Sequence, residues 1–401
     1  MTVNIQAKTS NMADQLANGS DHVPSIAFIL PGLGAGGSEH VVTMLASHFS
    51  REGARVSIIS FEGPTSRPYY DCDPGVVLRY LDVPVGRGSG FRAVTDVATR
   101  ILRLRKVLKQ HRPDLVISFL TRSNILAVLA GTGLGIPVIV SERNNPAKQR
   151  PGRIWEYLRG IAYPRAYGLV TMTQGAMNYF APNMRKRSWV IPNMADWQHF
   201  KPEPATGQKY MTAVGRLTGQ KGFDLLLQAF AQIAADHPQW TLRIWGEGDD
   251  RAELEQLTES LGISDRVEMP GVSGEPGSWI KQADAFVLSS RFEGWGLVLG
   301  EAMGAGLPCI SFDCEWGPAD MITDGDDGLL VADGNVDALA DAMARVMADP
   351  ELRERLAHNA PIAMERFSPD KILGHWQSMV HSVLSEQPIQ RRKEIHVPRV
   401  D

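Results

Sequence analysis

The chain has 401 residues, of which 43% are apolar and 21% charged, a composition typical of globular proteins and long enough for two domains. Three cysteines without a C-x-x-C pair, and histidines without an H-E-x-x-H pattern, exclude a disulfide scaffold and the common zinc motifs. The net charge of -4 conceals an asymmetry, because residues 1–200 are basic and residues 201–401 acidic. The N-terminal half therefore favours an anionic partner or surface, unless its charges form only a solvated face.

Residues 1–23 are polar and lack the apolar segment of a signal peptide, so we expect them to be disordered. The longest apolar run, residues 125–140, contains three glycines and Pro137. It fits a helix, a turn and a strand better than a membrane span. We therefore expect a cytoplasmic protein, bound at most peripherally to the inner membrane.

A predicted strand at residues 25–30 leads into a glycine-rich turn and a helix over residues 39–49. Gly32, Gly34 and Gly37 fit the pattern G-x-G-x-x-G, and Glu62 follows the next strand. This is the fingerprint of a dinucleotide-binding domain, so an NAD-dependent oxidoreductase is one open alternative. The motif alone is weak, because glycine loops at this place bind many anions.

Strands and helices alternate through both halves of the chain, which predicts an α/β fold of two doubly wound, Rossmann-like domains. Two D-x-D sequences, at residues 71–73 and 324–326, follow no apolar strand, and we interpret them as turn acids rather than metal ligands. The predicted divisions of the chain are a disordered segment 1–23, an N-terminal domain 24–204, a C-terminal domain 205–368, a helix 369–385 and a flexible tail 386–401.

The most informative stretch is a strand, loop, helix and strand over residues 285–312. Its loop places Arg291, Glu293 and several backbone N–H groups at the start of a helix, which attracts anions. Glu301 lies eight residues after Glu293, so both carboxylates can face one crevice. A diphosphate over the helix end, with carboxylates binding sugar hydroxyls, would suit a nucleotide-sugar. The alternative is an ordinary unit with solvated charges.

F-E-G-W-G-L-V-L-G-E-A-M-G-A-G-L-P, at residues 292–308, resembles the E-x7-E segment of retaining GT-B glycosyltransferases of the family-4 type. G-G-S-E-H (36–40) is similar to that family's first glycine loop, G-R-L-T-G-Q-K-G (215–222) to its diphosphate-binding loop, and residues 190–202 to its interdomain passage. The resemblance covers about residues 25–385. It implies an N-terminal acceptor domain and a C-terminal nucleotide-sugar domain that face a central cleft, and a last helix that crosses back.

The resemblance also implies roles for individual residues. Arg216 and Lys221 would bracket the donor diphosphate, and Glu301 would hold the ribose hydroxyls. Glu293 would be the catalytic residue beside the donor sugar, in a reaction that retains anomeric configuration. The other donor-binding residues would be Gly37, Gly246, Val272, Gly294, Trp295, Gly296 and Leu297. Because fixed cations and a helix start replace a metal ion, no metal or other cofactor is expected.

One segment departs from the family, because many members carry a histidine where this chain has Glu142, Arg143 and Asn144. We place these three residues on the acceptor side. The sequences S-F-L-T-R-S-N (118–124) and S-E-R-N-N-P (141–146) resemble a subgroup that builds bacterial exopolysaccharide on polyprenyl-diphosphate carriers. A basic, amphipathic stretch over residues 143–165 fits an anionic membrane surface, or else a helix packed on the core.

The sequence therefore predicts a hexosyltransferase that moves a hexose or N-acetylhexosamine from a UDP-sugar, or from GDP-mannose, to a lipid-diphosphate-linked acceptor. No nucleic-acid partner is expected. Besides the NAD-dependent oxidoreductase, two alternatives remain open: a glycosyltransferase with a soluble acceptor, and a subunit that binds sugar nucleotides without catalysis.

Overall fold

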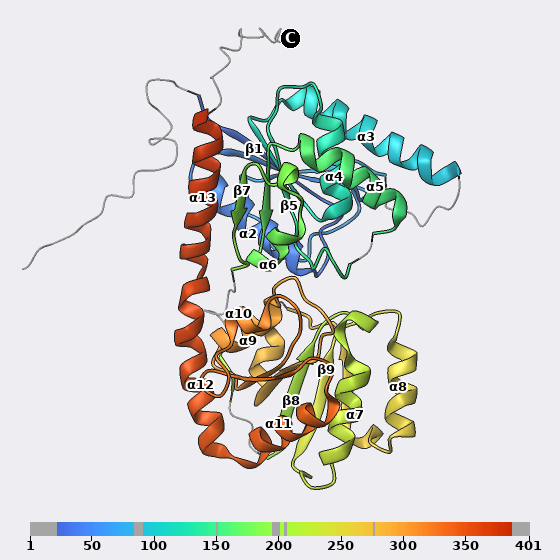
Figure 1. The fold of residues 1–401 in the computed structure, drawn as a ribbon, viewed down its shortest axis with the longest axis vertical. Helices are drawn as coiled ribbons and strands as arrows, with labels where there is room; N and C mark the ends of the chain where they lie inside the picture. The colour runs from blue at the N-terminus through green and yellow to red at the C-terminus, as the bar shows by residue number, and fades with distance from the viewer. Residues whose placement is uncertain are drawn as a thin grey trace, which may run out of the picture.

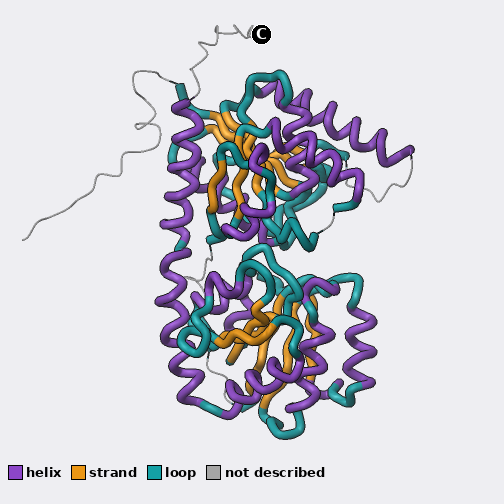
Figure 2. Tube along the Cα trace, viewed as in Figure 1, coloured by secondary structure: helices purple, strands orange, loops and turns teal. Residues whose placement is uncertain are grey.

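A computed structural model of the chain describes residues 22–83, 91–149, 151–194, 201–203, 207–275 and 277–386. Two α/β domains, each built on one parallel sheet, lie one above the other in Figure 1. Figure 2 shows helices on both faces of each sheet. The predicted α/β fold of two doubly wound domains is confirmed, whereas the predicted disordered segment 1–23 and the tail lie almost wholly outside the described residues.

The N-terminal sheet has seven parallel strands in the order β3-β2-β1-β4-β5-β6-β7. Its strands are β1 (Ser25–Leu30), β2 (Arg55–Ser60), β3 (Val77–Tyr80), β4 (Leu115–Phe119), β5 (Val138–Ser141), β6 (Gly168–Thr171) and β7 (Ser188–Val190). Its helices are α2 (Gly37–Arg51), α3 (Phe91–His111), α4 (Thr121–Gly131), α5 (Arg153–Ala162) and α6 (Gln174–Tyr179). Every residue of β4, β5 and β6 is buried, because helices cover both faces of the sheet centre.

The C-terminal sheet has six parallel strands in the order β10-β9-β8-β11-β12-β13. Its strands are β8 (Lys209–Val214), β9 (Trp240–Trp245), β10 (Val267–Gly271), β11 (Ala285–Leu288), β12 (Cys309–Asp313) and β13 (Leu329–Ala332). Its helices are α7 (Phe223–Ile233), α8 (Arg251–Ser260), α9 (Leu297–Gly304), α10 (Pro318–Met321), α11 (Val336–Ala348) and α12 (Pro350–Met364). Strand order reverses between β8 and β11, and a ligand crevice is expected at such a switch point.

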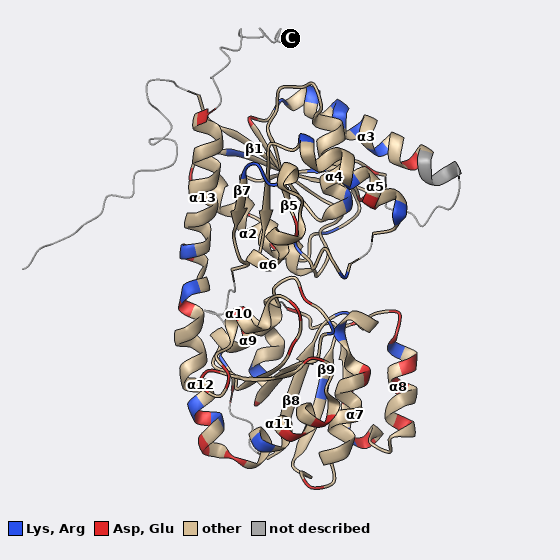
Figure 3. Cartoon of the chain, viewed as in Figure 1, with Lys and Arg blue, Asp and Glu red and all other residues tan. Residues whose placement is uncertain are grey.

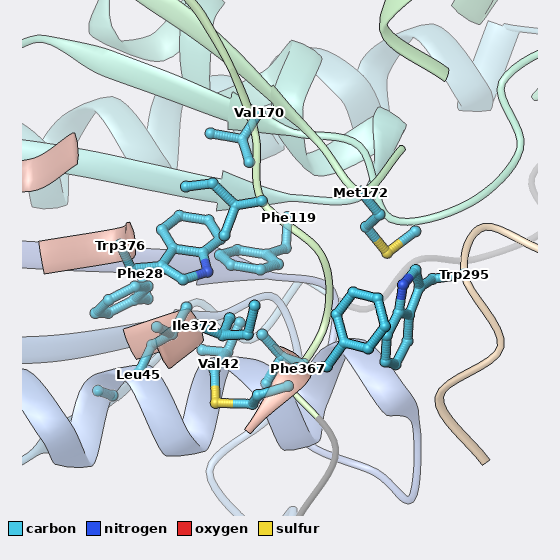
Figure 4. Close-up of a cluster of buried hydrophobic side chains, with 14 of the residues drawn as sticks. Phe28, Val42, Leu45, Phe119, Val170, Met172, Trp295, Phe367, Ile372 and Trp376 are labelled. Atoms are coloured by element: carbon cyan, nitrogen blue, oxygen red, sulfur yellow. The ribbon is translucent and has the colours of Figure 1, made fainter. Parts of the chain in front are cut away.

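Helix α13 (Pro369–Glu386) joins the two domains, since it continues from α12 and runs along the N-terminal domain (Figure 1). Trp376 on α13 is fully buried, and its ring stacks on Phe119 of β4 with centroids 5.9 Å apart. Figure 4 shows these rings in one apolar cluster with Trp295 and Phe367 of the C-terminal part of the chain. A shared apolar core therefore fixes the relative position of the domains.

Most predicted elements appear within two residues of their expected ends, but strand β3 was not predicted. It is an edge strand whose residues are half-buried or exposed, so it lacks the apolar run by which the central strands were recognised. Among the described residues, no helix is both long enough and apolar enough to cross a membrane.

Candidate active site

A cavity of about 1320 Å³ lies between the two domains. Loops that follow the carboxyl ends of β1, β5, β8, β9 and β11 line it, together with the start of α13. The carboxyl ends of parallel strands meet at one edge of each sheet, and here the two edges face each other. Every residue predicted to bind the donor lines this cleft: Gly37, Arg216, Lys221, Gly246, Val272, Glu293, Gly294, Trp295, Gly296, Leu297 and Glu301.

The loop between β8 and α7 supplies two cations to the cleft. Arg216 is exposed, and its guanidinium makes no hydrogen bond or ion pair within the described residues. Lys221 Nζ lies 2.7 Å from Glu293 Oε1, which also accepts a hydrogen bond of 2.7 Å from the Ser290 hydroxyl. Arg216 is therefore ready to receive an anion, whereas Lys221 shares its charge with a carboxylate that is only 6% exposed.

The cleft wall next to Glu293 is the start of α9. Gly296 precedes the helix with φ of 92° and offers no side chain to cap it, so the first backbone N–H groups keep their capacity to bind an anion. Trp295 is 1% exposed and its indole packs edge-on against Phe367 at 5.2 Å, so the ring belongs to the core. No side chain caps the start of α9, so its first N–H groups are available to a ligand.

Two glycines let neighbouring loops approach each other. Gly246 has φ of 138°, and a Cβ there would lie 1.9 Å from the carbonyl oxygen of Gly215. A Cβ on Gly37 would lie 3.1 Å from Leu297 Cδ2, across the cleft. The start of α2 therefore lies against the start of α9 in the other domain.

Three aromatic or imidazole side chains from the N-terminal domain also line the cleft near Glu301 and Ser273, and sequence reasoning missed them. His40 Nδ1 lies 3.6 Å from Glu301 Oε1, and the His40 ring stacks on Tyr70 at 4.5 Å. Tyr69 donates its hydroxyl to the carbonyl oxygen of Ser273, 2.9 Å away. Burial, and then the charge of Glu301, raises the pKa of the Tyr70 phenol. G-G-S-E-H contains His40, but no local pattern pairs it with residue 301.

Of the three residues predicted to lie on the acceptor side, only two lie in the cleft. Arg143 and Asn144 line the cleft, but Glu142 does not. The Glu142 carboxylate accepts hydrogen bonds from the hydroxyls of Thr121 and Tyr163 inside the domain, and burial raises its pKa. An acceptor in the cleft therefore cannot contact Glu142, because consecutive residues at the end of β5 point to opposite sides.

Arg291 also points away from the cleft. The sequence had placed it at the anion-binding end of α9. Its guanidinium makes two hydrogen bonds of 2.7 Å to Asp224 and lines a separate, smaller cavity. The prediction for Arg291 is wrong because α7 offers it a carboxylate on the outer side of the loop. Of the turn acids, Asp73 accepts from Gly75 N and Ser50 Oγ, as turn residues do.

Across the part of the chain that the structure describes, no group of three or more His, Cys, Asp or Glu residues is arranged to hold a metal ion. The two domains differ in charge, as the colours along the chain in Figure 3 show: acidic residues are frequent in α8 and α11 of the C-terminal domain, while α3 and α5 of the N-terminal domain carry mostly basic ones. The cations of the cleft are therefore set in an otherwise acidic C-terminal domain.

Two family descriptions together match most of the chain. Residues 195–362 match the family "Glycosyl transferases group 1", and residues 36–193 match "Glycosyl transferase 4-like domain". These ranges contain both walls of the cleft, apart from Gly34, Ala35 and the start of α13.

Named proteins of several bacteria are similar to the chain. It is 30% identical to the lipopolysaccharide core biosynthesis glycosyltransferase LpsD of Rhizobium meliloti, over 67% of the chain and 76% of that protein. It is 29% identical to an N-acetylgalactosaminyltransferase of Campylobacter jejuni whose name specifies a PP-undecaprenol-linked glycan, over 89% of the chain and 98% of the protein. It is 27% identical to an exopolysaccharide phosphotransferase of Streptomyces coelicolor over 94% of the chain, but spans only 42% of that relative.

Among solved structures, the fold is similar to that of Anabaena Alr3699/HepE, determined in complex with UDP and glucose. The TM-score is 0.73 at 20% identity, and the alignment covers 90% of this chain and 100% of the other. The arrangement of two parallel-sheet domains around a central cleft is therefore shared.

Proposed function

Because the chain belongs to the group 1 glycosyl transferases with a glycosyl transferase 4-like N-terminal domain, we propose that it transfers a hexose or N-acetylhexosamine from a nucleotide-sugar to a polyprenyl-diphosphate-linked glycan. The chain is a GT-B glycosyltransferase, and the family assignment displaces the NAD-dependent oxidoreductase as an alternative. Four features of the reaction are proposed: the donor, the acceptor, retention of configuration and independence from metal ions. A UDP-sugar is the favoured donor, and GDP-mannose is the second choice.

The observation that carries the proposal is the convergence of Arg216, Lys221 and the start of α9 on one side of the cleft, next to Glu293. A donor diphosphate would accept hydrogen bonds from the free guanidinium of Arg216 and from Lys221, and would lie over the N–H groups of α9. These contacts stabilise the negative charge that the leaving diphosphate gains. The Glu293 carboxylate would then face the sugar, where it can stabilise positive charge at the anomeric carbon.

The nucleoside would occupy the part of the cleft near Val272 and Glu301. Glu301 now lies beside His40, so its binding to ribose hydroxyls would require the imidazole to move or to share the carboxylate. Tyr69 and Tyr70 would close this part from the N-terminal domain. The role proposed for Glu301 therefore involves both domains.

The acceptor and the biological role are inferred from named relatives and from surface chemistry. One relative's name specifies a PP-undecaprenol-linked acceptor and another's specifies exopolysaccharide, and the N-terminal half of this chain is basic. We therefore expect a role in the synthesis of exopolysaccharide or of another bacterial glycan, at the inner membrane surface.

The donor is tested by thermal shift of the full-length protein with UDP, GDP and NAD. Stabilisation by UDP, or by GDP, supports the proposal, because a ligand that binds the folded state raises its unfolding temperature. Stabilisation by NAD alone would contradict it. Product linkage, read by NMR after transfer from a UDP-sugar to membrane extract, tests retention directly.

Replacing Arg216 by glutamine should weaken UDP binding by about 10- to 100-fold, because a charge-assisted contact to phosphate is lost. Isothermal titration calorimetry measures this directly. Arg345→Gln is the matched control in the same domain, since Arg345 is an exposed arginine of α11 that does not line the cleft. Equal UDP affinity in the Arg216 variant and the wild type would exclude the proposed diphosphate contact.

Turnover is expected to persist in EDTA within about twofold of its value in Mg²⁺, since two fixed cations and a helix start can stabilise the leaving diphosphate. The measurement is the transfer rate from a UDP-sugar after dialysis against chelator. Activity that disappears in EDTA and returns with Mn²⁺ would refute the metal-independent mechanism.

Helix α5 supplies a candidate membrane surface, because Ile154 and Tyr157 are 65% and 70% exposed. The basic face is smaller than the sequence suggested, since Arg143 and Arg159 of the predicted stretch 143–165 are buried. A double variant, Ile154→Glu with Tyr157→Glu, should lower partition to phosphatidylglycerol vesicles by at least about tenfold in co-sedimentation. High salt should weaken wild-type binding as well.

The matched control for α5 is Ile362→Glu, an equally exposed isoleucine on α12 of the other domain. It should leave vesicle binding unchanged. A wild-type protein that does not bind vesicles at any salt concentration would instead favour the glycosyltransferase with a soluble acceptor.

A further inference from the structure

Arg143 is a buried cation on the N-terminal wall of the cleft. It follows β5, is 7% exposed, and lines the cavity together with Asn193. Its guanidinium carbon lies 5.4 Å from the ring centroid of Phe119 and 5.8 Å from that of Trp376. The side chain is thus held against the stacked aromatic pair that joins the N-terminal sheet to α13.

The guanidinium has fewer partners than its burial requires. Nη2 donates to Asn193 Oδ1, but Nε and Nη1 have no hydrogen-bond partner. No described acidic side chain forms an ion pair with it, and burial lowers its pKa to about 9, so it remains cationic at neutral pH. A buried charge without a counter-charge destabilises a protein, and such strain is typical of sites that bind a ligand.

Arg159 shows that this environment is not general for arginines buried in this domain. It is equally buried at 7% exposure and also lies beside aromatic rings, those of Tyr179 and Phe180. However, it donates to the Tyr179 hydroxyl, 2.8 Å away, and only its Nη1 atom is buried without a partner. The charge of Arg159 also partly offsets the burial that raises the pKa of the Glu142 carboxyl. Arg159 therefore interacts with an internal carboxyl, whereas no such group accompanies Arg143, which lines the cleft.

We propose that Arg143, oriented by Asn193, forms a second anion-binding subsite in the cleft, which receives one anionic oxygen group of the acceptor. The group is a phosphate of the lipid carrier or a carboxylate of a sugar acid, since either can accept from Nε and Nη1 of one guanidinium. In the ligand-free protein, Nε and Nη1 are both shielded from solvent. The guanidinium therefore turns toward the cleft when the anion enters.

The subsite is separate from the one assigned to the donor. Arg216 and Lys221 come from the C-terminal sheet, while Arg143 comes from the facing N-terminal sheet. Assignment of the anion to the acceptor rests on the proposed function, in which the donor diphosphate occupies the C-terminal wall. The existence of the subsite does not rest on it, because the unpaired cation is present whatever the donor is.

The test is calorimetry on the full-length protein saturated with UDP, which occupies the donor wall. Inorganic phosphate, glucuronate and, as a neutral control, glucose are titrated at constant ionic strength. We expect phosphate or glucuronate to bind, and Arg143→Gln to weaken that binding by about 10- to 100-fold. Arg122→Gln is the matched control, since Arg122 is an exposed cation of the same domain that does not line the cleft.

The two anions distinguish between the two possible sources of the bound group, the lipid carrier and a sugar acid. Binding of phosphate that depends on Arg143 identifies the lipid-carrier phosphate, and binding of glucuronate identifies a sugar acid. Equal binding by wild type and Arg143→Gln, or no binding of either anion, overturns the proposal. Titrating phosphate into the wild type without UDP separates the two hypotheses: a wild-type protein that fails to bind UDP but still binds phosphate through Arg143 refutes only the donor assignment.

A stability measurement excludes a purely structural role. If the role of Arg143 is to bind a ligand, Arg143→Met should raise the unfolding temperature of the ligand-free protein by about 1–4 °C. The reason is that the substitution removes an uncompensated buried charge from a site lined by aromatic rings. A fall in unfolding temperature with unchanged anion binding would instead show that Arg143 serves the packing between β4 and α13.

Discussion

Replacing Glu293 by glutamine should lower kcat by about 100- to 1000-fold while donor affinity changes by no more than about threefold. The substitution keeps the shape of the side chain and removes only its charge. Because the Glu293 carboxylate is only 6% exposed and thus largely shielded from water, it interacts strongly with positive charge that develops at the anomeric carbon. Steady-state rates with a UDP-sugar, together with calorimetry for UDP, separate the two effects.

Donor affinity should be retained because of the contacts that Glu293 makes. Its Oε1 atom lies 2.7 Å from Lys221 Nζ and accepts from Ser290. Loss of the negative charge leaves Lys221 free to interact fully with the diphosphate, so the affinity for UDP is retained or rises. A variant with large losses in both kcat and UDP affinity would show that Glu293 mainly positions the donor loop.

Asp224→Asn is the matched control for Glu293. Asp224 is another carboxylate of the C-terminal domain that pairs with a cation at 2.7 Å, in this case Arg291, but the pair lies outside the cleft. Both partners are partly exposed, and such pairs contribute little to stability. The control should retain kcat within about twofold. Wild-type turnover in Glu293→Gln would exclude this residue as the catalytic group.

The sequence predicted the elements of both domains well because their cores follow simple rules. Parallel strands such as β4 and β9 are mostly apolar and almost fully buried, and amphipathic helices separate the strands, so their bounds can be read locally. Residues at the carboxyl ends of these strands were predicted as candidates for the same reason, since the loops after parallel strands meet at one edge. The edge strand β3 has no such signal.

The parts of the site that the sequence missed depend on contacts between residues far apart in the chain. Whether Arg291 faces the cleft is decided by Asp224 on α7, and the burial of Glu142 is decided by Tyr163. The contact of His40 with Glu301 exists only because the two domains meet. Side-chain direction at a loop and the docking of domains are therefore the two properties that local patterns did not reveal.

Gly294→Ala should lower kcat/KM by about 100-fold although both domains remain folded. A Cβ at this position would lie 2.6 Å from Asn144 Cα and 2.8 Å from the carbonyl oxygen of Arg143, both in the other domain. These backbone atoms follow β5 directly and cannot move aside easily, so the added methyl group displaces the loop that carries Glu293, or separates the domains. A displacement of about 1 Å between reacting groups is sufficient for a loss of this size.

The flexible end of Met172, 2.4 Å from the same Cβ, can rotate away, and so it is the backbone contact that makes the substitution costly. Gly274→Ala is the matched control, because a Cβ there has no neighbour within 4 Å and the loop belongs to the same domain. Rates, circular dichroism and small-angle scattering of both variants give activity, fold and domain separation. Near-wild-type turnover in Gly294→Ala would mean that the enzyme reacts in a more open arrangement than the one in which Gly294 touches the N-terminal domain.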